Sequence, residues 1–255
     1  MSDNSQAPTS RVARAAAVLA TASLGTADIG ILGVQIGALP PISGFYLFAL
    51  GAVLGALLSF LLGAVGIFLT NGGRDPVGAR RAWIGAGGGV LMLIVVLMGV
   101  SGGDGQAPPI NDITTNLGDP PSFASAAKAE ANQGRDMAYP AEFVSIVRKA
   151  YPDLAPLAVD HSRDEAYQKA LGAARTLGWT ITFEDAEAGT FEAQEQSAVF
   201  HFIDDISVRV TAAGSAAVID IRSKSRDGQG DMGVNAARIR AFGKAIVLGS
   251  VAAAR

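Results

Sequence analysis

The sequence predicts an α+β protein, with three N-terminal transmembrane helices followed by a soluble domain in which one antiparallel β-sheet packs against helices. The 255 residues are 49% hydrophobic and 17% charged, and residues 1–101 hold only five of the 20 basic and three of the 23 acidic side chains. After residue 178, apolar and polar residues alternate in four segments that are joined by short turns, which is typical of antiparallel strands. The first part therefore has the composition of a membrane region and the second that of a water-soluble domain.

Three apolar segments lie near the N-terminus, at residues 12–32, 45–69 and 82–100. Each reaches the roughly 20 residues that are needed to cross a hydrocarbon layer of ~30 Å. Because lipid offers no partner for a free N–H or C=O group, each segment must be helical.

The arginines predict the orientation of these helices. Arg11 and Arg14 precede the first segment, and Arg74, Arg80 and Arg81 lie between the second and the third. The positive-inside rule then places the N-terminus and the 70–81 loop in the cytoplasm. After three crossings the soluble domain lies on the other side, which is the periplasm if the membrane is a bacterial inner (plasma) membrane.

Composition predicts four parts of the chain. Residues 1–11 are short and polar, and we expect a disordered cytoplasmic leader. Residues 12–100 form the three-helix transmembrane region, and the Gly- and Pro-containing residues 101–109 form a flexible linker. Residues 110–255 form the periplasmic α+β domain.

Asp28 lies within the first apolar segment. A carboxylate deep in lipid is costly and usually functional. The segment can also be framed so that Asp28 lies in the interface near the outer end, and we favour that placement. Glycines four residues apart, at Gly51 and Gly55 and at Gly85 and Gly89, allow close helix approach. We expect them to pack the three spans together rather than to form a dimer face.

The soluble domain begins with an extended arm at residues 110–123, followed by a helix that Pro152 ends and by a short strand at 156–159. Ser162 and Glu165 form a capping box that starts an amphipathic helix. The pattern then predicts four strands and a last helix, at residues 179–184, 190–196, 199–211, 216–223 and 234–248.

A basic stretch at residues 220–244 provides the strongest candidate site. On a strand, Asp220, Arg222, Lys224 and Arg226 share one face, which we expect to face water because Ile219 and Ile221 share the other. The glycine-rich turn that follows brings backbone amides to a helix start, where amides and the helix dipole attract anions. The candidate ligand-binding residues are Arg222, Ser223, Ser225, Arg226, Asp231, Gly233, Asn235 and Arg238.

A structural interpretation of the same residues is also open. Asp231 and Asn235 would then cap the last helix, and Arg238 would pair with Asp220 or Asp231. Asp204 and Asp205 alternate across a strand and cannot serve one site as paired catalytic carboxylates. We expect structural ion pairs instead. One of these two aspartates would pair with Arg209 or Arg222 on a neighbouring strand, and Asp220 would also take part in such an ion pair.

Several classes of function lack support in the sequence. The chain has no cysteine, which excludes disulfides and Cys-based metal sites, and its net charge of −3 does not favour nucleic-acid binding. Neither His161 nor His201 has a second histidine at helical spacing. We therefore expect no bound metal and no cofactor.

The motifs resemble a known but uncharacterised family. The residues Phe202-Ile-Asp204-Asp205, Arg222-Ser-Lys-Ser-Arg226, Asp231-x-Gly233-x-Asn235 and Arg238-Ile239 are similar to the signature of domain of unknown function fourteen ninety-nine, found in bacteria and plastids, often after membrane spans. The resemblance covers about residues 109–248. It implies no activity that could be carried over, and the residues before Asp204 depart from the family pattern around His201.

From these observations we expect a non-enzymatic, membrane-anchored periplasmic module that binds or scaffolds an envelope partner or an anionic ligand, such as a phosphate-bearing lipid head group. One alternative is a hydrolase with an aspartate base beside Arg222 and Arg238. Another is an accessory subunit of a membrane complex that acts through Asp28. A homo-oligomer is compatible with each of these hypotheses.

Overall fold

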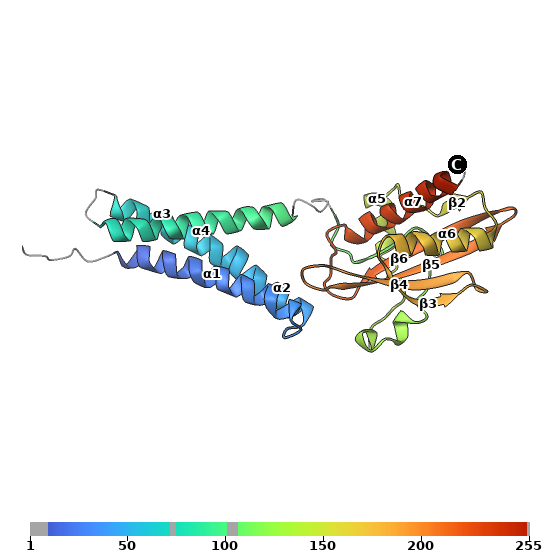
Figure 1. The fold of residues 1–255 in the computed structure, drawn as a ribbon, viewed down its shortest axis with the longest axis horizontal. Helices are drawn as coiled ribbons and strands as arrows, with labels where there is room; N and C mark the ends of the chain where they lie inside the picture. Colours follow the sequence, from blue (N-terminus) through green and yellow to red (C-terminus); the bar gives the residue numbers. More distant parts are fainter. Residues whose placement is uncertain (1–9, 72–74, 101–106, 254–255) are drawn as a thin grey trace, which may run out of the picture. The chain divides into compact units, whose positions relative to one another are not determined.

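The computed structural model describes residues 10–71, 75–100 and 107–253 (Figure 1). The chain divides into two compact units, one formed by Met1–Gly102 with Ala198–His201 and the other by Gly103–Ser197 with Phe202–Arg255.

The first unit contains long apolar helices. They are α1 (Arg11–Gln35), α2 (Pro41–Ala49), a π-helical segment (Leu50–Gly55), α3 (Ala56–Thr70) and α4 (Pro76–Val100). Within the described residues, three stretches are long and apolar enough to cross a membrane, namely Arg11–Gln35, Pro41–Thr70 and Pro76–Leu97. The prediction of three apolar helices near the N-terminus is confirmed, and each is longer than the segment read from hydropathy.

Polar residues fix the starts of α1 and α4. The Ser10 hydroxyl accepts a hydrogen bond from Ala13 N at 3.3 Å, as an N-cap does. The Asp75 carboxylate accepts one from Gly78 N and one from Ser10 N, each at 2.7 Å, and these bonds lower the pKa of Asp75. One carboxylate therefore joins the starts of both helices.

Glycine lets the apolar helices approach backbone to backbone. Gly51 lies against the Ser23 carbonyl of α1, and Gly89 lies against the Ala56 carbonyl of α3. Gly63 lies against the backbone of Ala86 in the same way. The glycines therefore pack the helices of this one chain together, as the spacing predicts.

The second unit contains one antiparallel sheet (Figure 1). The strand order is β1-β6-β5-β4-β3, and β2 also pairs with β6. The strands are β1 (Asp112–Thr114), β2 (Leu157–Val159), β3 (Thr180–Asp185), β4 (Thr190–Gln196), β5 (Ile203–Ala213) and β6 (Ala216–Ser225). The predicted α+β class with an antiparallel sheet is confirmed, and three residues of the expected arm form the short strand β1.

The helices of this unit are α5 (Phe143–Ala150), α6 (Arg163–Thr176) and α7 (Val234–Ala253). Two short 3₁₀ turns, Ala126–Lys128 and Glu130–Asn132, precede them. Helix α6 begins at the expected capping box, in which Ser162 and Glu165 bond each other's backbone N–H groups.

Strand β5 begins later than its hydrophobic pattern predicts. Ser197 N donates to Phe202 O at 2.8 Å, and Phe202 N donates to Ser197 Oγ at 2.9 Å. His201 within this turn has a φ of 52°. The turn uses residues that the pattern assigns to the strand, so that pairing starts at Ile203.

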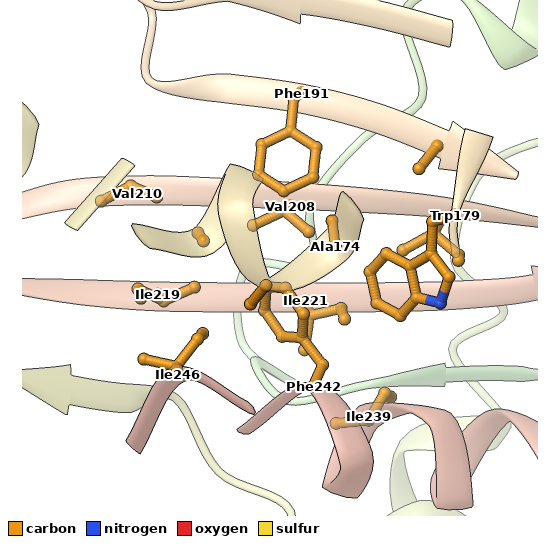
Figure 2. Packing of buried hydrophobic residues seen from close by; sticks show 14 of the residues in the cluster. Ala174, Trp179, Phe191, Val208, Val210, Ile219, Ile221, Ile239, Phe242 and Ile246 are labelled. Carbon is orange, nitrogen blue, oxygen red and sulfur yellow. The ribbon is translucent and has the colours of Figure 1, made fainter. Parts of the chain in front are cut away.

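The hydrophobic core lies between one face of the sheet and helices α6 and α7 (Figure 2). The rings of Trp179 and Phe242 stack with centroids 5.1 Å apart. The core side chains include Ala174, Phe191, Val208, Val210, Ile219, Ile221, Ile239 and Ile246. Because Ile219 and Ile221 point to this side of β6, the side chains of Asp220 and Arg222, which alternate with them, point to the opposite side.

Candidate functional site

Strand β6 separates the predicted ligand-binding residues onto two faces of the sheet. Ser223 and Ser225 lie on the helix-covered face with Ile221, where Ser223 bonds Asn235 of α7. Arg222 and Arg226 lie on the other face. The eight predicted residues therefore do not form one pocket, because alternate strand residues point in opposite directions.

Arg222 is the centre of the first polar cluster. Its Nε and Nη2 donate to the two Asp112 carboxylate oxygens at 2.9 and 2.7 Å, and further bonds go to the carbonyl oxygens of Pro121 and Met137. The guanidinium carbon lies 4.7 Å from the Phe123 ring centroid and 5.3 Å from that of Tyr139. Bidentate pairing and cation–π contact both suit a desolvated arginine.

The expectation that this charged row faces water is wrong for Asp220 and Arg222, since each is 2% exposed. The segment between β1 and α5 covers this face of the sheet and bonds its side chains. Ser207 donates to Ser122 O at 2.8 Å, and backbone amides at residues 124–126 donate to the Glu192 carboxylate. This irregular segment has no apolar periodicity, and it covers the face of β6 that the alternation of residues predicts to contact solvent.

The remaining charges of this face are paired within the unit. Arg226 donates to both oxygens of Asp205, at 2.8 and 2.6 Å, and this interaction raises the pKa of Arg226. Arg209 Nη2 lies 2.7 Å from Asp220 Oδ2. Lys224 shares Asp112 with Arg222, at 3.1 Å. Neither Asp204 nor Asp205 bonds Arg209 or Arg222 as we expected, because Asp220 and Asp112 are nearer to those arginines.

Arg238 of α7 is the centre of the second polar cluster, on the helix-covered face. Its Nη2 lies 2.6 Å from Asp204 Oδ2, and its Nε pairs with Glu195. Its Nη1 donates to Ser223 Oγ at 3.0 Å and to Asn235 Oδ1. The expected pairing of Arg238 with Asp220 or Asp231 is therefore wrong, because Asp220 lies on the other face and Asp231 is engaged in the turn.

Asn235 links the second cluster to the strands. Its Oδ1 accepts from Ser223 Oγ at 2.6 Å, and its Nδ2 donates to Ser225 Oγ at 3.0 Å and to Asn111 O at 3.2 Å. The Asn235 side chain therefore links α7, β6 and the residue before β1. It does not have the helix-capping role that the structural interpretation predicts.

Asp231 occupies the amides of the glycine-rich turn. Its two oxygens accept from Gly233 N and Asn235 N, each at 2.9 Å, which is the expected capping role. Gly233 has a φ of 84°, a conformation that glycine adopts without steric cost. Burial raises the pKa of Asp231 above its ordinary value of 3.8. An external anion would have to compete with this carboxylate for the turn amides.

A cavity of about 380 Å³ that is open to solvent lies beside Arg222. Its lining combines two polar side chains of the cluster with mostly apolar residues, namely Leu117, Pro120, Ser122, Met137, Ala138, Tyr139, Ala141, Val144 and Arg222. The buried Tyr139 hydroxyl has no hydrogen-bond partner among the described residues. Burial raises the pKa of this hydroxyl, with a smaller effect of Asp112, so that it remains a neutral donor.

The lining of the cavity contains no carboxylate and no histidine among the described residues. Within the same ranges, no group of three or more His, Asp or Glu side chains is placed to hold a metal ion. Tyr139 is not among the residues that the sequence predicts for the site, because it lies 83 residues before Arg222 and no local pattern marks it.

Comparison with known families agrees with the motif resemblance. A family model described as a protein of unknown function (DUF1499) matches residues 112–246. This range begins with β1 and ends within α7, so it spans both polar clusters and the cavity. No curated protein matches the chain.

Proposed function

Because this chain belongs to the DUF1499 family, whose members have no assigned activity, we propose its function from the geometry of the α+β unit. We propose that the protein is a membrane-anchored binding module of the bacterial inner membrane, with a cytoplasmic N-terminus and with residues 110–255 in the periplasm. Its ligand would occupy the cavity beside Arg222, and its head group would be anionic.

The single observation that carries this proposal is the Tyr139 hydroxyl, a buried donor without a partner in a residue that lines a cavity. A buried polar group that lacks a hydrogen bond costs about 1–3 kcal/mol, and native proteins retain few of them. An acceptor on a ligand that displaces the side chains covering this hydroxyl would remove this cost.

The charge of the neighbouring cluster favours an anion. Asp112 faces both Arg222 and Lys224, so one carboxylate balances two cations and these three residues together carry a net charge of +1. Arg222 has five N–H donors, of which four make hydrogen bonds within the unit. The cluster therefore retains both a charge and a donor for a ligand.

The lining favours a ligand with an apolar body. Leu117, Pro120, Met137 and Val144 form apolar walls, and the volume of about 380 Å³ suits a small molecule or one end of a lipid. We therefore propose an amphiphile with a carboxylate or phosphate head, which refines the expected lipid head group. Arg226, Ser223, Ser225, Asp231, Gly233, Asn235 and Arg238 would support the domain and not touch this ligand.

The test compares Tyr139→Phe with the unchanged chain, purified whole in an uncharged detergent. The probes are octanoate, octyl phosphate, octanol and octylamine, titrated by equilibrium dialysis below their micelle concentrations. We expect the two anions to bind more tightly than octanol and octylamine, and Tyr139→Phe to weaken anion binding by about tenfold, since a lost hydrogen bond to a charged group costs ~1.5 kcal/mol.

The matched control is Tyr46→Phe, which removes the hydroxyl of an exposed tyrosine in the helical unit and should leave binding unchanged. A second variant, Ala141→Trp, fills the cavity and should weaken all probes. Equal anion binding by the unchanged chain and Tyr139→Phe, or a preference for octylamine, would contradict the proposal.

A further inference from the structure

Asp28 lies on an exposed side of α1. It is exposed, and so are its helical neighbours Leu24 and Leu32, at 50% and 60%. The buried side of α1, which includes Ala16, Ser23 and Ala27, faces the other helices of the unit. The carboxylate therefore points away from the packing interface of its own bundle.

The helix length places this carboxylate within the hydrocarbon layer when α1 spans a membrane. Asp28 lies 14 residues after Arg14, or about 21 Å along a helix of 1.5 Å rise per residue. A hydrocarbon layer is ~30 Å thick, so with Arg14 at one interface Asp28 lies about 9 Å short of the other. This is deeper than the interfacial placement that the sequence favours.

The apolar helices themselves supply no counter-charge at that depth. Asp28 is the single charged residue between Arg14 and Arg74, and residues 82–103 contain none. A second copy of the chain would therefore bring another aspartate and no cation to this surface. An isolated carboxylate in lipid costs several kcal/mol, and such groups usually pair within a bundle.

We infer that the Asp28 side of α1 binds a transmembrane helix of a different protein, which carries a Lys, Arg or His side chain at the same depth. Gly25 supports close approach on this side, since a Cβ built there meets no atom within 4 Å. The partner helix would pack over Leu24, Gly25 and Asp28, and its basic side chain would pair with the carboxylate. This inference does not depend on the ligand of the α+β unit.

The experiment places a photo-cross-linking phenylalanine analogue at Leu24 of the full chain in its native membrane. The control position is Leu54, which is also 50% exposed but lies outside α1. We expect one adduct from Leu24 and not from Leu54, at least fivefold reduced by Asp28→Asn and retained by Asp28→Glu.

The identified partner decides the outcome. Its cross-linked transmembrane segment should contain a basic residue, replacement of that residue by Leu should abolish the adduct, and exchange of the two charges between the proteins should restore it. An adduct of twice the chain mass, an adduct unaffected by Asp28→Asn, a partner without such a residue, or no adduct at Leu24 would each overturn the inference.

Discussion

At the scale of single residues, Arg222 shows why a charged strand can be buried. Removing an arginine and an aspartate from water costs several kcal/mol per ion, which only good geometry and further hydrogen bonds offset. Asp112 supplies the two-point contact, and the carbonyls of Pro121 and Met137 accept further N–H groups. A solvated row and a paired buried row have the same sequence pattern.

The burial of this pair predicts a large loss of stability on substitution. Arg222→Met would leave the buried Asp112 with Lys224 alone, and we expect a loss of about 3–5 kcal/mol. Urea unfolding of the full chain in detergent, followed by Trp179 fluorescence in a Trp83→Phe background, measures the loss. Arg240→Met is the control, because its pair with Asp153 is about half exposed and should contribute ~1 kcal/mol or less. Similar losses for both variants would contradict this account.

Asp231 predicts a specific pH dependence. Burial raises the pKa of its folded-state carboxyl above 3.8, so the folded state holds the proton more tightly than the unfolded state. Between the two pKa values, the contribution of Asp231 to stability therefore falls as pH rises. We expect the stability difference between the unchanged chain and Asp231→Asn to increase in favour of the unchanged chain as pH is lowered from about 7 toward 4.

Asp153 provides the opposite case for this measurement. The hydrogen bond from Arg240 lowers the pKa of Asp153, so its contribution is present above the unfolded pKa and is lost as pH falls through the folded pKa. The same comparison with Asp153→Asn should therefore show a difference that shrinks in acid. Parallel pH trends for the two aspartates would show that the effect does not come from their local surroundings.

At the scale of elements, β6 organises the α+β unit. It pairs with β1, β2 and β5, and its two faces carry different chemistry. The side of Ile219 and Ile221 packs on helices, and the side of Asp220 and Arg222 bonds an irregular segment. Its period of two was readable in the sequence. The cover on its polar side was not, because that segment has no apolar period and lies about 100 residues before β6 in the chain.

The helices of the first unit make a prediction about close packing. A Cβ at Gly63 would lie 2.8 Å from Ala86 Cα and 2.9 Å from Ala82 O, whereas one at Gly87 would meet no atom within 4 Å. Gly63→Ala should therefore destabilise the bundle by about 1–3 kcal/mol, as overpacking does. Gly87→Ala should be neutral or slightly stabilising, because alanine favours a helix. Unfolding in SDS, followed by Trp83 fluorescence in a Trp179→Phe background, distinguishes them; equal effects would argue against this packing.

At the scale of the whole molecule, the proposed function depends on which side of the membrane the α+β unit occupies. The arginines at the start of α1, at residue 74 and at the start of α4 predict a cytoplasmic N-terminus. We expect alkaline phosphatase to be active when fused after Arg255 and inactive when fused after Asn71. Green fluorescent protein at the same two sites should give the reverse result. A fluorescent fusion after Arg255 would place the binding unit in the cytoplasm and contradict the proposed class of ligand.

The sequence alone determined the class of the fold, the three apolar helices, the capping box at Ser162 and membership of an uncharacterised family. Each of these rests on local periodicity or on residues that lie close together in the chain. Such patterns can be recognised in one segment without knowing which other segment it packs against. The tertiary structure decided which charges are buried and which residues meet. Arg222 bonds Asp112, and Arg238 bonds Asp204, across 110 and 34 residues of chain. Ion pairing between distant segments depends on how the sheet brings them together, and no local sequence pattern indicates which distant residues will meet.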